Sequence, residues 1–331
     1  MVNVISFTYN GHCLNRKLCS VFDTFRKFEF DGSFKTGDFA KKSFEEGSPM
    51  VFIGAAGIAV RAAAPFIKDK MHDPAVIVID EKGRYVIPLL SGHVGGGNKL
   101  AVTIADALGA VPVLTTATDV NGLFAVDVFA AENGLVIKER ELAKKISSLI
   151  LKGEKIPFVT RLEVSGGIPK EINLYSPGND NGTGFVISPF KENPFLNTLH
   201  LIPKNAAVGI GCRRGASVYD IEKAVFSALE RSNIDFLAVK NIATIDIKKD
   251  ENGLLEFCGK YDIKPVFYSA EELKNAEGVF SHSDFVQEKT GVGNVCERSA
   301  VLCEGNIVAG KSVLNGVTTA ISMKGGSVCF E

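Results

Sequence analysis

The sequence predicts an α/β fold, in which two α/β domains with largely parallel sheets are joined by a variable middle segment. The chain has 331 residues, and domains typically hold roughly 100–200 residues each. Short Val/Ile runs alternate with helical periods, a pattern typical of strands buried on both faces of a sheet. The alternation stops in polar, Gly/Pro/Asn-rich sequence at 165–183 and resumes at 206. We therefore expect an N-terminal α/β domain at 1–138, a middle or linker region at 139–205 and a C-terminal α/β domain at 206–331.

In the N-terminal domain, the alternation is clearest between residues 51 and 115. Its apolar runs and helical periods predict strands at 51–54, 75–80, 85–90 and 111–115, and helices at 58–67 and 99–108. Beyond this domain, residues 139–152 form a predicted helix with an apolar face made by Leu142, Ile146, Leu149 and Ile150.

The C-terminal domain begins with a predicted strand at 206–211 that runs into glycine. Ser217 is a suitable N-cap for the following helix, with Asp220 at its third position. Further strands are expected at 236–239, 242–247, 266–268, 307–309 and 317–321, and helices between them complete the α/β alternation.

The composition excludes several classes of protein. Lys plus Arg total 37 against 38 Asp plus Glu, so no global field of the kind found in nucleic-acid or membrane-surface proteins is expected, and an anionic partner must be held locally. The seven cysteines include no Cys-x-x-Cys pair, which predicts reduced thiols and a cytoplasmic protein. Neither a signal peptide nor a membrane-spanning run is predicted.

A glycine-rich turn at 90–98 joins a predicted strand to a predicted helix. Backbone N–H groups at such a turn, near the positive end of a helix dipole, suit an anion. Asn98 is the expected N-cap, and Ser91 and His93 lie among Gly92, Gly95 and Gly96. The spacing fits neither a dinucleotide-binding fingerprint nor a phosphate loop. The alternative is a tight turn whose glycines only permit left-handed backbone.

Polar residues also follow the predicted strand at 111–115. Thr116, Thr118 and Asp119 would lie at its carboxyl end, where open α/β sheets bind ligands, and Asp127 follows eight residues later. Helix capping or turn chemistry is an equal alternative for these side chains. A Ser91, His93 and Asp119 or Asp127 triad is a minority mechanism, because Ser91 is not in a Gly-x-Ser-x-Gly elbow.

A second anion site is predicted where the strand at 206–211 ends. Gly211 is followed by Cys212, Arg213 and Arg214 just before a helix, and guanidinium groups bind carboxylate or phosphate in a bidentate manner. The alternative for the two arginines is a surface position. Cys212 is expected to be a small buried residue, and Cys296 and Cys303 core-facing positions of one helix. The five isolated histidines predict no metal site.

These residues together resemble the cobalt-precorrin-5A hydrolases of anaerobic cobalamin biosynthesis. The resemblance covers all but the stretch from 151 to 205, and it is carried by a set of short strings: Gly57-Ile-Ala-Val-Arg61, Lys70, Asp73-Pro-Ala-Val76, Leu89-Leu-Ser-Gly-His93, Gly95-Gly96, Asn98, Thr115-Thr-Ala-Thr-Asp119, Asp127, Gly209-Ile-Gly-Cys-Arg-Arg-Gly215, Cys296-Glu297 and Lys311.

The resemblance implies an activity: opening of the ring A δ-lactone of cobalt-precorrin-5A and loss of C20 with its methyl group as acetaldehyde. It implies no cofactor, because the cobalt comes with the substrate. The catalytic candidates are His93, Ser91, Asp119 and Asp127. The expected substrate-binding residues are Arg61, Lys70, Gly92, Gly95, Gly96, Asn98, Thr116, Thr118, Gly211, Arg213 and Arg214.

Glycine turns and arginines would serve a non-catalytic tetrapyrrole carrier equally well, so that function remains the alternative. The partners considered are the tetrapyrrole, other enzymes of the pathway and a second copy of the chain. Nucleic acid and membrane are not among them.

Overall fold

The computed structural model describes residues 1–69, 72–92, 95–116, 120–175 and 182–330. Four residues expected in the site, Lys70, His93, Thr118 and Asp119, lie outside these ranges. The chain divides into two compact units, Met1–Val128 and Phe129–Glu331. Each unit is described by itself.

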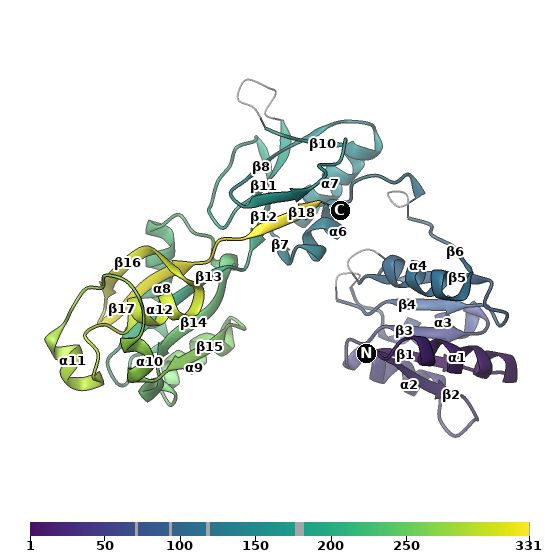
Figure 1. The fold of residues 1–331 in the computed structure, drawn as a ribbon, viewed down its shortest axis with the longest axis horizontal. Helices are drawn as coiled ribbons and strands as arrows, with labels where there is room; N and C mark the ends of the chain where they lie inside the picture. The colour runs from purple at the N-terminus through teal and green to yellow at the C-terminus, as the bar shows by residue number, and fades with distance from the viewer. Residues whose placement is uncertain (70–71, 93–94, 117–119, 176–181, 331) are drawn as a thin grey trace. The chain divides into compact units, whose positions relative to one another are not determined.

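Unit 1 is a six-stranded sheet in the order β2-β1-β3-β4-β5-β6, with helices on both faces (Figure 1). Its strands are β1 (Val2–Ser6), β2 (Phe25–Glu29), β3 (Met50–Ile53), β4 (Val76–Ile79), β5 (Tyr85–Leu90) and β6 (Val111–Pro112). Its helices are α1 (Tyr9–Val21), α2 (Thr36–Glu45), α3 (Ala56–Ala63), η1 (Ala64–Phe66), α4 (Gly97–Leu108) and the first residues of α6 (Val126–Glu132).

The burial of β3 explains its continuous apolar run. Val51 and Ile53 pack on one face with residues of α1 and α4, while Met50 and Phe52 pack on the other with residues of α2 and α3. Successive side chains of a strand point to opposite faces, so a sheet covered on both sides needs an apolar residue at every position. The predicted α/β class is confirmed in this unit.

The direction of β5 differs from the expectation of a parallel neighbour. Strands β2, β1, β3 and β4 are parallel, but β5 is antiparallel to β4, and Leu90 pairs with Val76. Strand β6 is parallel to β5. The turn at 91–98 and residue Thr116 therefore lie at the edge where β4 begins, and not at the carboxyl edge of the parallel strands, where we expected them.

Unit 2 contains two five-stranded sheets. The first has the order β10-β8-β11-β12-β7, with α7 (Arg140–Leu151) packed on it. Its strands are β7 (Leu135–Ile137), β8 (Ile156–Thr160), β10 (Ile172–Leu174), β11 (Thr183–Ile187) and β12 (Asn197–Pro203). Strand β9 (Glu163–Gly166) pairs with the C-terminal strand β18 (Ser327–Phe330). The polar sequence around 165–183 thus contributes strands to unit 2.

The second sheet has the order β15-β14-β13-β17-β16. It is built from β13 (Ala206–Cys212), β14 (Val239–Ile245), β15 (Lys264–Tyr268), β16 (Asn306–Leu314) and β17 (Val317–Met323), with β13, β14 and β15 parallel. The helices are α8 (Val218–Arg231), η2 (Phe236–Ala238), η3 (Asp246–Lys248), α9 (Asn252–Lys260), α10 (Ala270–Lys274), α11 (Asp284–Thr290) and α12 (Cys296–Glu304).

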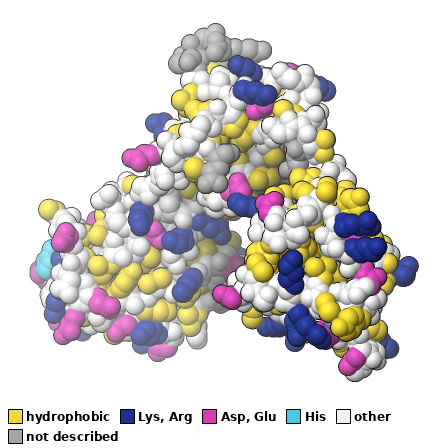
Figure 2. All heavy atoms as spheres, turned by 45° about the vertical axis from the view of Figure 1, so that its right-hand side comes forward, with side chains coloured by type: hydrophobic (Ala, Val, Ile, Leu, Met, Phe, Trp, Pro, Cys, Tyr) yellow, Lys and Arg dark blue, Asp and Glu magenta, His cyan; other side chains and the backbone are white. Residues whose placement is uncertain are grey.

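Helix α8 begins as its sequence predicts. The Ser217 side chain accepts a hydrogen bond from the backbone N–H of Asp220, and Ile221, Val225 and Leu229 are buried. Figure 2 shows basic and acidic side chains interspersed over the visible surface, in keeping with their nearly equal numbers. None of the described helices is long and apolar enough to cross a membrane. All seven cysteines are free thiols.

Candidate functional site

The glycine-rich turn of unit 1 is closed by two backbone hydrogen bonds. Gly97 N donates to Ser91 O at 3.0 Å, and Asn98 N donates to Gly92 O at 2.8 Å. Ser91 has φ +53°, which is uncommon for a residue with a side chain. Gly96, the N-cap of α4, has φ +69°. The N-cap is therefore Gly96 and not Asn98, so the predicted cap is wrong by two positions.

Two glycines of this turn are required by close packing. A Cβ atom at Gly92 would lie 2.6 Å from Asn98 Oδ1, and one at Gly95 would lie 2.8 Å from Ser91 O. A tight turn alone thus explains part of the glycine content. The Ser91 hydroxyl is not explained in this way, because its oxygen is buried and has no hydrogen-bond partner among the described residues.

The structure brings together two predicted segments of this site. Asn98 Nδ2 donates to Thr116 Oγ1 at 3.2 Å, which joins the start of α4 to the segment after β6. Asp127 lies in the first turn of α6, where its Oδ1 accepts from Val128 N at 3.1 Å. Arg61 is exposed on α3, with its guanidinium beside Gly57 of the same helix.

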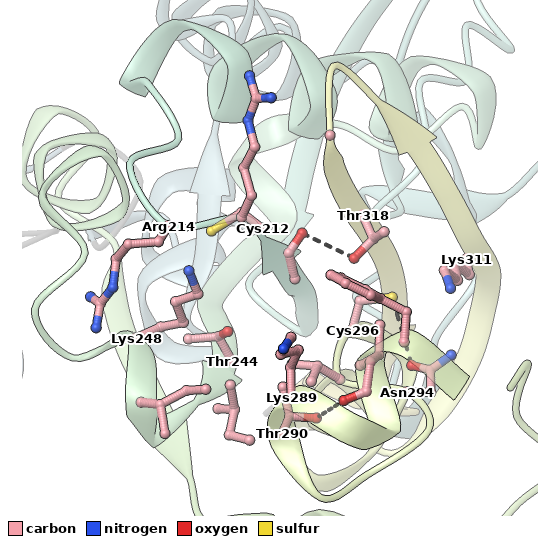
Figure 3. A pocket seen from close by; sticks show the side chains of 18 residues that line it. Cys212, Arg214, Thr244, Lys248, Lys289, Thr290, Asn294, Cys296, Lys311 and Thr318 are labelled. Atoms are coloured by element: carbon pink, nitrogen blue, oxygen red, sulfur yellow. Dashed lines mark hydrogen bonds between the residues drawn. The ribbon is translucent and has the colours of Figure 1, made fainter. Parts of the chain in front are cut away.

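In unit 2, a cavity of about 510 Å³ lies where β13 and β14 end. Gly211 and Cys212 of β13, Thr244 and Ile245 of β14, and the segments around α11 and the start of α12 line it (Figure 3). Thr318 Oγ1 donates to Gly211 O at 3.0 Å. A Cβ atom at residue 211 would lie 2.5 Å from Thr318 Oγ1, so glycine at this position allows β17 to approach β13 beside the cavity.

Five cationic side chains surround this cavity: Arg213, Arg214, Lys248, Lys289 and Lys311. None of its lining residues that the structure describes is acidic. The local excess of positive charge contrasts with the net charge of −1 for the whole chain. An anion would be held here by nearby cations and not by the field of the whole protein.

The cations differ in how far they are already neutralised. Arg214 lies 2.6 Å from Asp250 Oδ1 and 3.9 Å from Glu251 Oε2, and Lys248 Nζ lies 2.9 Å from Glu251 Oε2. Within the described part of the chain, Arg213 has no carboxylate oxygen within 4.0 Å. Asp220 interacts with Arg213 only over a longer distance, through which Arg213 helps to lower the pKa of Asp220. Arg213 is therefore better able than Arg214 to bind an added carboxylate.

The thiols at the cavity are poor nucleophiles. Burial raises the pKa of the Cys212 thiol, although Lys248 opposes the effect. Burial raises the pKa of Cys296 to about 11. Both thiols therefore stay protonated at neutral pH. They are poor nucleophiles because the thiolate is the reactive form. No group of three or more His, Cys, Asp or Glu side chains suited to a metal ion occurs among the described residues.

Sequence reasoning placed Gly211, Arg213 and Arg214 at a site, and all three line this cavity. It missed Lys248, which follows β14 just as the two arginines follow β13, so the same rule could have found it. Lys289 comes from α11 and gives no local signal. Lys311 belongs to the strings that carry the family resemblance, but no role was assigned to it.

Comparison with known proteins matches almost the whole chain to one family. The cobalamin synthesis G N-terminal family matches residues 38–119, the cobalamin biosynthesis central region matches 124–203, and the cobalamin synthesis G C-terminus matches 206–322. A curated cobalt-precorrin-5A hydrolase from Salmonella typhimurium is 34% identical over 307 residues, which cover 89% of this chain and 86% of that relative.

The chain belongs to the cobalt-precorrin-5A hydrolase family. This membership confirms the resemblance seen in the sequence and makes the chain a hydrolase of cobalamin biosynthesis. A second member of the family, from Priestia megaterium, is 37% identical over 281 residues, covering 79% of this chain and 74% of that relative. A solved structure of a cobalamin biosynthesis protein G homolog from Sulfolobus solfataricus aligns with 97% of this chain at 21% identity and a TM-score of 0.40, and the alignment covers 96% of that chain.

Proposed function

We propose that this chain hydrolyses cobalt-precorrin-5A: it opens the ring A δ-lactone and releases C20 with its methyl group as acetaldehyde, leaving cobalt-precorrin-5B. The observation that carries the proposal is family membership, with relatives of that activity aligned over most of both chains. The proposal does not depend on any single residue.

The cavity of unit 2 supports a tetrapyrrole substrate. Such a molecule is an apolar disc edged with acetate and propionate carboxylates. Small side chains such as Cys212, Thr244 and Cys296 line the cavity together with its cationic residues. Ligand sites typically combine an apolar lining with a few placed charges, within roughly 300–1,000 Å³. We assign this cavity to binding of the carboxylate-bearing edge.

The reaction consumes water and needs no other reactant. Water adds to the lactone carbonyl, the ring C–O bond breaks, and a carboxylate and a C20 hydroxyl result. The hydroxyl then gives up its proton while the bond from C20 to the macrocycle breaks. The electron pair passes to the macrocycle, which takes up a proton, and acetaldehyde leaves. We therefore propose that the protein uses no cofactor.

Two functions must come from the protein: a base for water and a donor to the tetrahedral oxyanion. Our candidates are His93, Asp119, Asp127 and Ser91. The Ser91 hydroxyl supports a role for this turn, because a buried polar atom without a partner is costly and is more often kept for function than for stability.

The test is incubation of the purified chain with cobalt-precorrin-5A, followed by acetaldehyde detection and mass measurement of the tetrapyrrole. Acetaldehyde formed in step with a product one water heavier and one acetaldehyde lighter is the expected result. Tight binding of the tetrapyrrole without acetaldehyde would overturn the proposal in favour of a carrier.

We further propose that the chain acts in the cytoplasm, as its seven free thiols suggest, without nucleic acid or membrane. Its proposed protein partners are a second copy of the chain and other enzymes of the pathway. Light scattering of the purified chain, alone and mixed with those enzymes, tests both associations.

A further inference from the structure

A buried carboxylate lies next to the cavity without lining it. Glu297, in the first turn of α12, is only 8% exposed. It follows Cys296 and lies three residues after Asn294, both of which line the cavity. Burying a charge is costly unless hydrogen bonds compensate it, so the partners of this carboxylate indicate what it does.

Three segments donate hydrogen bonds to Glu297 within the described chain. Its Oε2 accepts from Ser281 N at 2.9 Å, Ser281 Oγ at 2.9 Å and Asn294 Nδ2 at 2.6 Å. Its Oε1 accepts from Lys311 N at 2.8 Å. Burial favours the neutral acid, but the donors at Lys311 and Ser281 outweigh it and lower the pKa of Glu297. The carboxylate is therefore charged and links the segment before α11, the start of α12 and strand β16.

Strand β16 is irregular where it meets this carboxylate. Ala309 pairs with Ile321 and Ser312 pairs with Thr319, so three residue steps along β16 face two along β17. Lys311 lies in this bulge, and bulges redirect side chains from their regular alternation. The backbone N–H of Lys311 is held by Glu297 while its side chain lines the cavity (Figure 3).

We propose that Glu297 is a positioning residue: by binding the backbone of Lys311 at the bulge, it aims the Lys311 ammonium into the cavity to bind a substrate carboxylate. The inference rests on the proposed function only in its choice of ligand. Glu297 itself touches no substrate and acts through Lys311.

Helix α12 offers a matched control for a purely structural role. Glu304 lies on the same helix, is 6% exposed, and pairs with Lys240 Nζ at 2.8 Å. It does not line the cavity. Glu304→Gln therefore removes an equally buried carboxylate from α12 without affecting Lys311.

The experiment is a double-mutant cycle with Glu297→Gln and Lys311→Ala. A glutamine has only one acceptor oxygen. With that oxygen on the side of Ser281 and Asn294, where Oε2 accepts three hydrogen bonds, the NH₂ group faces Lys311 N and the restraint on Lys311 is lost. Binding is measured by fluorescence titration with a porphyrin octacarboxylate, and KM and kcat by acetaldehyde release. Glu297→Gln should weaken binding and raise KM about tenfold or more, the loss expected for one charge-assisted hydrogen bond, with little change in kcat.

In the Lys311→Ala background, Glu297→Gln should have almost no further effect, and Glu304→Gln should leave binding unchanged in either background. Additive effects of the two substitutions would overturn the inference, as would equal loss of binding in Glu304→Gln. If Glu297→Gln does not fold, Glu297→Asp, whose shorter side chain keeps the charge but withdraws it from Lys311 N, replaces it in the cycle under the same criteria.

The two proposals fail in different ways. A wild-type chain that binds the porphyrin but releases no acetaldehyde contradicts the proposed function, and the cycle still decides the role of Glu297 through binding. A wild-type chain that does not bind the porphyrin contradicts the positioning role, whatever the outcome for acetaldehyde.

Discussion

The two neighbouring arginines at the cavity should contribute unequally to substrate binding. Arg214 is already paired with Asp250 at 2.6 Å, whereas Arg213 has no carboxylate within 4.0 Å in the described part of the chain. Removing Arg213 should cost one charge-assisted interaction, about 1.5–3 kcal/mol. Arg213→Ala should therefore raise KM by about 10- to 100-fold, and Arg214→Ala should raise it less.

The assay is steady-state acetaldehyde release over a range of cobalt-precorrin-5A concentrations. Because we propose that both side chains bind substrate and do no chemistry, kcat should change little, which is the signature of lost uniform binding. Arg161→Ala serves as the control, because Arg161 forms an exposed ion pair with Glu192 in the same unit and does not line this cavity. The effect of Arg213→Ala should shrink at high salt.

Two outcomes would refute this reasoning. A larger rise in KM for Arg214→Ala than for Arg213→Ala would show that existing ion pairs do not limit substrate binding. A collapse of kcat at constant KM would make Arg213 part of the chemistry.

Three further predictions concern the turn of unit 1 and the core of unit 2. Gly209→Ala should destabilise unit 2 by about 1–3 kcal/mol or more, because a Cβ atom there would clash with the backbone of Cys296. Denaturant unfolding measures this loss. The control is Gly259→Ala, which should be neutral or stabilising because the space around Gly259 is open. Ser91→Gly should preserve or raise the melting temperature, because glycine adopts a left-handed φ without strain. It should nevertheless reduce acetaldehyde release, and full activity would exclude the hydroxyl from the reaction. His93→Ala should lower kcat about 10²–10⁴-fold in a variant that still folds. Wild-type turnover by that folded variant would remove His93 from the mechanism.

Local patterns were sufficient to predict many elements of the sheet of unit 1 and of the second sheet of unit 2, but the strand expected at 236–239 is wrong, because Phe236–Ala238 form the short helix η2 and β14 begins at Val239. The runs at 51–54, 75–80 and 206–211 correspond to β3, β4 and β13, and helix α8 begins at its predicted cap. These features depend on neighbouring residues, since strand burial and capping are determined by side chains close in sequence.

The direction of β5 was missed although the sequence contains the necessary signal. Only residues 80–84 separate β4 from β5, and parallel neighbours need a crossover of about a dozen residues or more. Asp80 closes this short turn by accepting from Arg84 N at 2.6 Å and Tyr85 N at 2.7 Å. The length of this connection therefore predicts an antiparallel β5 and a glycine turn at the edge of the sheet where β4 begins.

The sequence by itself determined the family, the α/β class and the strand ends that carry Gly211, Arg213 and Arg214. Only the tertiary structure showed that Lys289 and Lys311 join them around one cavity, and that Glu297 reaches the backbone of Lys311. The physical reason is that periodicity and capping act over a few residues, whereas this cavity depends on sheet order and a bulge, which bring together segments nearly a hundred residues apart.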